Sequence, residues 1–550
     1  MPVNSQVPPK TKAGAVERGL EIHKLEPEEE TSEELILEKE PERLSLLEGE
    51  KVLIKEFIFE GNVILSSGFL NKLVFSYINR ELSLSQIEEV CEAIALRYHK
   101  RGYFLARVIL PAQEIKDGAV KLLILEGRLG RIQIDGVRFY SPDFIRNKFH
   151  PAKQGAIHHA SLLKSLILLN ENLGLKVKAT LKKGELPQTV DILLDIEDNL
   201  PFGLSLDYNN FGSKYNSKHR AGLSTEMGNL LLQGSKLSLR GIGGITDENL
   251  WFGELVYQLP LTHYGTKLEL SYLKSDFNVG RDFRVLNTGG KSEVYSLGLI
   301  HPLIRTRASR LDFLLGFDHK DIENYLLGAV NSDDELSIFR AGLTCNHLDS
   351  FGGKNIIDSV ISVGIDDMLG ALNHDDPLAS RAGAGGEFVK FDLDFTRIQK
   401  LPCSCFLIVK ASGQTASDAL PVCEQFYVGG GDSVRGFPIA EYLGDYGYFG
   451  GFEVRVPIPF LSELTVPFTK GRKFREFVQM AGFVDHGKVF LKNPQVGQDK
   501  DSEISGAGAG LRLNICGFNV SLDWGFRIGG EEPSTGADSV FYISAEKKLF

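Results

Sequence analysis

The chain has 550 residues and a formal net charge of −11, with 43% hydrophobic and 24% charged residues. Its length predicts about two to four structural units, and its negative charge argues against a general nucleic-acid-binding protein. Six cysteines are too few for a dense disulfide framework in a chain of this length. The sequence contains no apolar run of about 18 residues, so no transmembrane helix is predicted. The start, MPVNSQVPPKTKAG, contains no apolar core of a signal peptide, so no signal is visible.

The negative charge is concentrated near the N-terminus. Residues 21–50 contain twelve Glu and three Lys or Arg, which gives a local net charge of −9. Charge runs of this kind are usually a solvated helix face or a tail without fixed structure. We therefore expect residues 1–50 to form an acidic linker, with a candidate helix from Ser32 to Leu47.

Two tandem copies of one small α+β module follow, at residues 51–127 and 128–199. Each copy reads as strand, helix, helix, strand, strand, and the helices show the apolar period, as at Ile87, Val90 and Ile94. FEGN after the first strand of one copy aligns with IDGV of the other, and LLILEG aligns with LLDIED. The repeat predicts two β-α-α-β-β domains.

From residue 200 to residue 550 the helical period disappears, and apolar and polar residues alternate between Gly, Asn and Asp turns. A water-soluble sandwich also alternates. Two features favour a barrel with lipid outside and a wet lumen inside. The apolar faces run unbroken for five or six positions, and the opposite faces mix charged residues with glycine. About 350 residues, at ~20–24 per strand and connection, predict an antiparallel transmembrane β-barrel of about 16 strands. In FNVSLDWGFRIG the apolar face consists of Phe518, Val520, Leu522, Trp524, Phe526 and Ile528.

Two short motifs stand out in this region, GGGDSVRGFP at 429–438 and FVDHG at 483–487. The first is poorly explained as a phosphate loop, because Val434 occupies the last glycine position of G-x-G-x-x-G and no clear helix follows. In the second, Phe483 and Asp485 share one face of the expected strand. A carboxylate that faces lipid is costly, and one that faces the lumen requires a cation.

Residues 51–550 resemble the transporters of two-partner secretion. The resemblance rests on the motifs VRGF and FVDHG, the pair of modules and the barrel pattern. These are the haemolysin-activator or haemagglutinin-secretion outer-membrane proteins of the Omp85 superfamily. The resemblance implies that the modules are POTRA domains and that the VRGF loop, with Val434, folds back into the lumen. Arg435 would then pair with Asp485, and the planar fork of an arginine suits a bidentate partner.

The resemblance also implies roles for the surrounding residues. Gly436 and Gly487 would allow close backbone approach, and Phe437 and Phe483 would pack beside the ion pair. The lead of the loop would be a flexible hinge formed by Gly429, Gly430 and Gly431.

The function implied is an outer-membrane pore that receives an unfolded secreted exoprotein through periplasmic POTRA domains and translocates it without ATP. The cargo would add a strand to a sheet edge. Candidate edges are FLARVILP (104–111) and LKVKATLKKG (175–184), although both can also be ordinary sheet strands. The residues expected to contact cargo are Leu105, Arg107, Ile109, Val177 and Lys178.

Other partners follow from the resemblance. The barrel would contact outer-membrane lipid, and the barrel-assembly machinery would insert it. The last strand departs from the usual pattern, because Glu546 and Lys548 share the parity of Phe550; a bulge or a frayed end could reconcile this. Family members often begin with a plug helix, which residues 32–47 could form; a loose acidic tail is the alternative.

We expect no cofactor, no nucleic acid and no enzyme activity, because no catalytic constellation is readable. Cys403, Cys405 and Cys423 are only a weak metal signal. Two rival functions remain open: an insertase of the same superfamily that assembles other outer-membrane proteins, and a structural or adhesive barrel with adaptor domains. Two POTRA-like modules favour secretion, since assembly proteins commonly have more.

Overall fold

The computed structural model describes residues 35–37, 51–149, 155–186, 189–245, 250–280, 285–374, 376–466, 469 and 471–550. The chain forms two compact units, one ending at Pro201 and the other beginning at Phe202. Within these described residues, no helix has the length and apolar character needed to cross a membrane.

The first module of the N-terminal unit differs from the expected order in one respect. The segment 51–62 forms two strands, because β2 pairs with β4 while β3 pairs in parallel with β6. The sheet order is β3-β6-β5, and helices α2 and α3 pack on it around a core that includes Ile94 and Tyr98. The elements are β2 (Val52–Ile54), β3 (Glu56–Glu60), α2 (Ser67–Val74), η3 (Phe75–Tyr77), β4 (Arg80–Leu82), α3 (Leu84–Lys100), β5 (Arg107–Ile109) and β6 (Ala119–Leu125).

The second module has the predicted β-α-α-β-β order. Its sheet is β1-β8-β9-β7, in which strand β1 (Leu35–Leu37) pairs in parallel with β8. The helix expected over 32–47 is therefore a strand at Leu35–Leu37, and its other residues lie outside those described. The remaining elements are β7 (Arg128–Asp135), α4 (Pro142–Lys148), α5 (His159–Asn170), β8 (Leu175–Lys183) and β9 (Thr189–Asp198).

Each module has an acidic residue at the end of its last strand: Glu126 directly follows β6, and Asp198 is the last residue of β9. This correspondence is offset by one residue from the sequence alignment. Glu126 accepts hydrogen bonds from the backbone N–H groups of residues 63 and 64, and Asp198 accepts from those of 138–140. Tyr98 donates to Glu126, and burial together with this carboxylate raises the pKa of Tyr98, so its hydroxyl stays a donor. Glu126 thus corresponds to Asp198, whereas LLILEG aligned with LLDIED matches it to Glu197.

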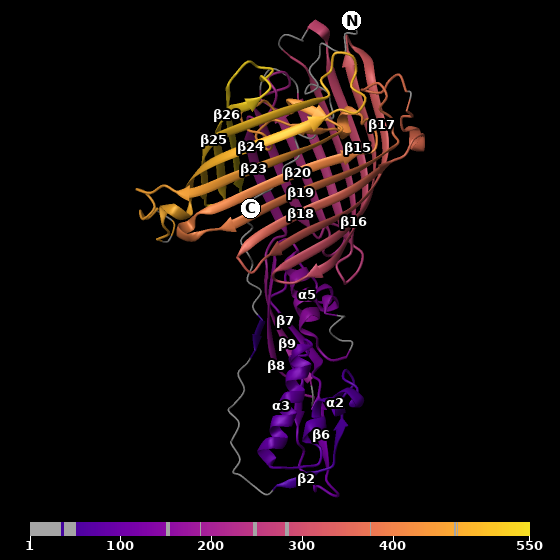
Figure 1. The fold of residues 1–550 in the computed structure, drawn as a ribbon, viewed down its shortest axis with the longest axis vertical. Coiled ribbons are helices and arrows are strands. Elements are labelled where there is room, and N and C mark those ends of the chain that lie inside the picture. Colours follow the sequence, from indigo (N-terminus) through magenta and orange to yellow (C-terminus); the bar gives the residue numbers. More distant parts are fainter. Residues whose placement is uncertain are drawn as a thin grey trace. The chain divides into compact units, whose positions relative to one another are not determined.

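The second unit is an antiparallel barrel (Figure 1). It is closed and has sixteen strands, and β27 pairs with β10. The fold class predicted from the alternation is confirmed. The strands are β10 (Phe202–Asn209), β11 (Arg220–Gly228), β12 (Lys236–Gly244), β13 (Leu250–Pro260), β14 (Lys267–Asn278), β15 (Gly289–Arg305), β16 (Ser309–Leu326), β17 (Ala329–Leu348), β18 (Gly353–Gly364), β19 (Phe388–Lys400), β20 (Phe406–Ala416), β23 (Tyr446–Pro457), β24 (Val478–Phe490), β25 (Asp501–Ile515), β26 (Phe518–Gly530) and β27 (Ser539–Lys548).

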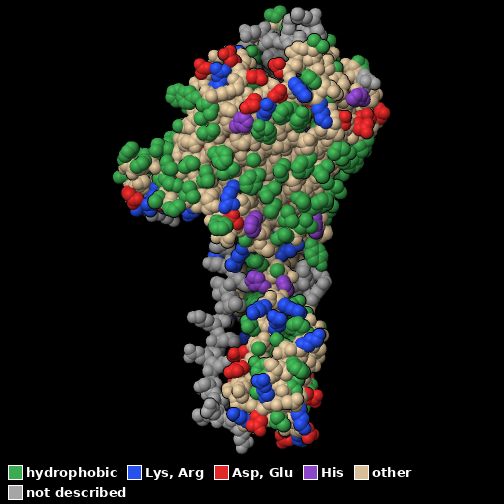
Figure 2. Space-filling view, in the orientation of Figure 1, with side chains coloured by type: hydrophobic (Ala, Val, Ile, Leu, Met, Phe, Trp, Pro, Cys, Tyr) green, Lys and Arg blue, Asp and Glu red, His purple; other side chains and the backbone are tan. Residues whose placement is uncertain are grey.

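The outer surface of the barrel carries a broad band of hydrophobic side chains (Figure 2). On β26, Trp524 is 53% exposed while its neighbour Asp523 is 8% exposed and faces the lumen, as the alternation predicts. On β27, Tyr542 faces the lumen, so Glu546 and Lys548 also face inward by parity, without a bulge. Phe550 lies beyond the end of this strand.

We call the end of the barrel where β10 begins and β27 ends the terminal end, and the opposite end the distal end. The connection between β20 and β23 lies at the distal end, as do those between β18 and β19 and between β24 and β25. Among the described residues, Cys403 lies in the β19–β20 turn at the terminal end and Cys423 in a distal connection, with β20 between them; none of the six cysteines forms a disulfide.

Candidate functional site

The connection from β20 to β23, residues 417–445, is called the lumen loop. It contains a small hairpin of β21 (Phe426–Val428) and β22 (Tyr442–Gly444). Directly after β21, Gly429 and Gly430 have φ values of 104° and 112°, a region that glycine adopts at little cost. These glycines turn the chain into the segment that carries the VRGF motif.

In the tip of the lumen loop, residues 431–437, positions 433–437 are buried against the inner wall of the barrel. Val434 and Phe437 have no exposed surface. They pack with Phe449, Val489 and Ile504 of the neighbouring strands β23, β24 and β25. The loop therefore folds back into the lumen instead of extending from the distal end.

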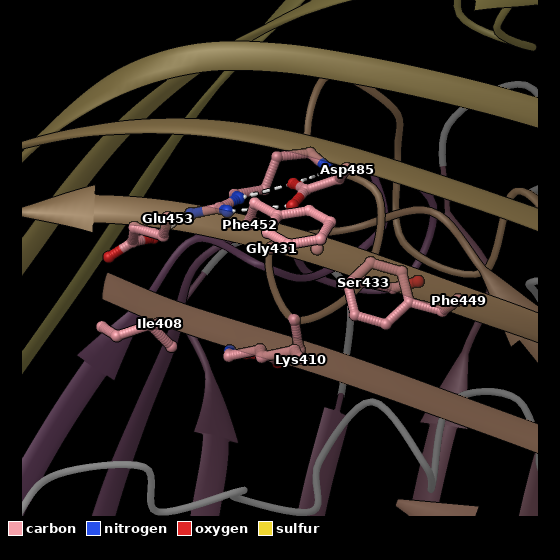
Figure 3. A pocket seen from close by; sticks show the side chains of 11 residues that line it. Ile408, Lys410, Gly431, Ser433, Phe449, Phe452, Glu453 and Asp485 are labelled. Atoms are coloured by element: carbon pink, nitrogen blue, oxygen red, sulfur yellow. Dashed lines mark hydrogen bonds and ion pairs between the residues drawn. The ribbon is translucent and has the colours of Figure 1, made fainter. Parts of the chain in front are cut away.

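At the tip, Arg435 lies against Asp485 of β24 (Figure 3). Arg435 Nε donates to Asp485 Oδ2 at 2.7 Å and Nη2 donates to Oδ1 at 3.0 Å, and the backbone N–H of Arg435 donates to Oδ2 at 3.2 Å. The ring of Phe483 lies 3.5 Å from Arg435 Cζ, a cation–π contact. The Asp485 side chain is 1% exposed, so this bidentate pair is shielded from water.

Arg435 is one member of a larger charged cluster, of which the sequence analysis missed most. Arg435 Nη1 donates to Glu453 of β23 at 2.6 Å and lies 3.8 Å from Asp523 of β26. Arg512 of β25 bridges the same two carboxylates at 3.0 and 2.9 Å, and Arg455 pairs with Glu453 at 2.7 Å. With Asp485, three arginines balance three carboxylates. Parity was the signal that could have found them, because Glu453 follows the exposed Phe452 and Asp523 precedes the exposed Trp524.

The backbone of the tip touches the barrel wall so closely that glycine is required on both sides. Gly436 has φ of 106°, and a Cβ on Gly506 of β25 would lie 1.8 Å from the carbonyl oxygen of Arg435. Tyr542 of β27 fixes the next peptide, because its hydroxyl donates to Phe437 O at 2.5 Å and accepts from Gly436 N at 3.2 Å. Even one methyl group would therefore displace the tip.

Two other glycines of the predicted site, Gly487 and Gly431, leave room for neighbouring side chains and do not have hinge backbone angles. Gly487 leaves room for Val428 and Val434, since a Cβ there would lie 2.8 and 3.0 Å from their methyl groups. Gly431 does not have a positive φ and faces the ring of Phe211. It also lines the small pocket beside the Arg435 site (Figure 3). Of the three predicted hinge glycines, only the first two have hinge backbone angles.

The two candidate cargo edges in the N-terminal unit differ. On β8, residues 179–181 pair with β1, and the N–H of Val177 donates to Asn170 Oδ1 at 2.6 Å while Asn170 Nδ2 donates to Val177 O. Val177 is buried in the core of the second module, and Lys178 is exposed. This edge is thus occupied by β1 and by the side chain of Asn170.

The edge formed by β5 is different, because β5 pairs with β6 on one side only among the described strands. Arg107 and Ile109 are exposed on it. Leu105 precedes the strand and packs against the core of the second module, so its side chain is unavailable to cargo. The structure thus leaves Arg107 and Ile109 as candidate contacts.

Relatives of this chain are known. The outer membrane transporter CdiB of Dickeya dadantii is 26% identical over 402 residues, which cover 71% of this chain and 70% of the relative. The heme/hemopexin transporter protein HuxB of Haemophilus influenzae strain Rd is 24% identical over 539 residues, covering 92% and 90%. The solved structure of CdiB from Escherichia coli has a TM-score of 0.77 at 20% identity and covers 93% of both chains.

BamA from Haemophilus ducreyi lacking POTRA domains 1–3 is also similar, with a TM-score of 0.53 at 14% identity, covering 91% of this chain and 100% of that one. At these identities the solved structures establish the fold alone. The family model of the ShlB-type POTRA domain matches residues 52–127. The model of the haemolysin secretion/activation proteins matches residues 188–513, more than half of the chain. This protein therefore belongs to the haemolysin secretion/activation protein family ShlB/FhaC/HecB.

Proposed function

We propose that this protein is an outer-membrane pore that receives an unfolded exoprotein through periplasmic POTRA domains and releases it at the cell surface. The observation that carries the proposal is the buried Arg435–Asp485 contact, which holds a loop inside the lumen of a sixteen-stranded barrel. A loop held this way closes a pore reversibly. The terminal end of the barrel then faces the periplasm, and the distal end faces the outside.

Cargo recognition belongs to the N-terminal unit in this proposal, with domains at 51–127 and 128–199. The open edge of β5 accepts an extended segment through backbone hydrogen bonds, which are tolerant of sequence. The β8 edge becomes available when β1 leaves it. Translocation uses no nucleotide; its driving force is binding in the periplasm and folding of the cargo outside.

The broadest test removes the gene and measures the proteins of the culture medium. Loss of one large exoprotein, restored by the intact gene, is the expected result. A general fall in outer-membrane barrel proteins would instead favour the insertase function, whose fold is shared with BamA. Unchanged secretion and unchanged barrel levels would favour a structural role.

The edges are tested by site-specific photocrosslinking in the full-length protein. A crosslinker at Ile109 should capture the exoprotein, whereas one at Thr180, which pairs with Ile36 of β1, should not. Ile36→Pro removes a strand donor and should make Thr180 reactive. Capture at Thr180 in the unchanged protein, with none at Ile109, would reverse the assignment of the edges.

A further inference from the structure

The distal end of the lumen contains an apolar core. A wet lumen is lined with polar side chains, but near the distal end the inward faces of the strands turn apolar. Side chains of the connecting loops pack on them, so that this level of the barrel resembles the interior of a soluble protein. The wall contributes Phe252, Phe277, Ile322, Leu336 and Phe388, and the loops contribute Tyr215, Leu372, Leu420 and Cys423.

One carboxylate ties three distal loops together at this core. Asp445, at the base of the lumen loop, has no exposed surface. It accepts from Arg381 Nη1 at 2.5 Å, from the N–H of Leu420 at 2.8 Å and from the N–H of Lys492 at 2.6 Å. Arg381 belongs to the β18–β19 loop and Lys492 to the β24–β25 loop. Removal of this carboxylate therefore weakens the contacts of three segments at once, although Arg381 still donates to Lys492 O.

A second carboxylate fixes the base to the barrel wall. Glu424 is 3% exposed and accepts from Lys320 Nζ of β16 at 2.8 Å and from Lys390 Nζ of β19 at 2.6 Å. In addition, Ser380 joins the β18–β19 loop to both sides, because its N–H donates to Asp334 and its hydroxyl accepts from the N–H of Val422. The base is thus anchored to strands on the β16–β19 side.

The tip of the same loop has different partners. Its charged contacts are to Asp485, Glu453 and Asp523 on β23 to β26, and the contacts of the base named above include none of these residues. Release of the tip therefore leaves the base and the apolar core in place, and the lumen stays closed at the distal end.

We propose that Asp445 and Glu424 close a second gate, the distal gate, formed by the loop residues packed in the apolar core, and that cargo leaves only when this gate and the Arg435 contact have both opened. The inference rests on the proposed transport function. A carboxylate that loses its charge still fills its site, so Asp445→Asn weakens the gate without creating a cavity. Arg381→Met removes the same ion pair from the other side.

The test measures single-channel conductance of the purified full-length protein in planar lipid bilayers. Asp445→Asn and Arg381→Met should each raise the open fraction by about tenfold, which corresponds to about 1.4 kcal/mol. The double variant should open no more than either single variant, because both remove one ion pair. The matched control is Asp318→Asn, which removes another buried carboxylate paired with an arginine, Arg340 of the neighbouring strand, and should conduct like the unchanged protein.

Insertion is checked separately by the heat-dependent electrophoretic mobility of the folded barrel. If Asp445→Asn fails to insert, Arg381→Met carries the test. Unchanged conductance in the inserted variants, an equal rise in the Asp318→Asn control, or fully additive single effects would each overturn the distal gate. Conductance needs no cargo, so the failure of the gate and the failure of the transport function can be told apart. If the Asp445→Asn variant conducts but the cell exports no exoprotein, the proposal of a distal gate stands and the transport function is refuted.

Discussion

The lumen loop is held differently at its two ends. At the tip, three arginines and three carboxylates from five segments meet in a balanced cluster, and the backbone approaches a glycine-bearing wall. At the base, buried carboxylates sit on an apolar core. The tip therefore depends on each charge and on shape, whereas the base depends on packing that many residues share. A single substitution should release the tip more completely than the base.

The largest effect is expected from Arg435→Ala. The substitution leaves Asp485 and Glu453 as buried carboxylates with excess negative charge, and breaking one partner of a buried pair typically costs about 3–5 kcal/mol. The released tip cannot return to its site, so we expect the pore to lose the reversible closure that the proposed transport requires. Secretion should therefore fall by about a hundredfold or more, measured as exoprotein in the medium, while the barrel still inserts. Asp485→Ala should behave similarly.

The control for charge alone is Arg527→Ala on β26, whose side chain contacts Asp538 at 3.7 Å outside the cluster. It should secrete normally. Normal secretion by both Arg435→Ala and Asp485→Ala would remove the tip contact from the mechanism.

A smaller effect should follow from Gly506→Ala, which tests shape without changing charge. The added methyl group would overlap the carbonyl oxygen of Arg435, so the tip must shift and lose its bidentate geometry. We expect about tenfold less secretion, since a misfit of this kind costs on the order of 1–3 kcal/mol. Gly482→Ala on the adjacent strand β24, where a Cβ meets nothing within 4 Å, is the matched control, and equal loss in both variants would contradict the steric argument.

The double variant Arg435→Ala with Asp445→Asn tests whether the tip and the base open independently. Sites without shared partners usually contribute additively, within about 0.5 kcal/mol. The open fraction in bilayers should therefore rise by the product of the single effects. A coupling much larger than this value would mean that tip and base open as one unit.

The smallest effect should come from Glu424→Gln at the base. Its partner Lys390 keeps Asp392 at 3.4 Å, and the Lys320 side chain is 21% exposed, so neither lysine is left fully uncompensated. Because each lysine keeps Asp392 or solvent as a partner, the open fraction should rise only about threefold, which corresponds to about 0.7 kcal/mol. An effect exceeding that of Asp445→Asn would place the main anchor of the base at Glu424.

Alternation, together with the length of the region, was sufficient to predict the barrel and about 16 strands, because the period of two is a local property. The outward position of Trp524 and the inward position of Asp523 followed from it. It was insufficient at the distal end. Trp251 and Phe252 are adjacent aromatic residues of β13, yet Trp251 is 45% exposed and Phe252 is 3% exposed. A rule that lumen-facing residues are polar cannot decide which of these two aromatic residues faces inward, because the apolar partners in the lumen come from connecting loops far along the chain.

The charged cluster could be predicted only in part for a similar reason. A motif resemblance brought Arg435 to Asp485, although 50 residues separate them. Arg512 and Glu453, 59 residues apart, meet only through the register of three barrel strands. Strand β1 is hidden in an acidic segment, and its extended form depends on an edge of β8 that lies far along the chain.

The β5 edge proposed for cargo, on which no other described strand pairs, is only three residues long, and this length would limit how long cargo stays bound. Such an edge offers about two backbone hydrogen bonds, each contributing about 1 kcal/mol, so the residence time of any one segment is short. Because most differences in affinity arise from dissociation rates, a longer edge would hold the chain and slow its progress. The short strand suits a polypeptide in transit, whose successive segments must bind, dissociate and be replaced.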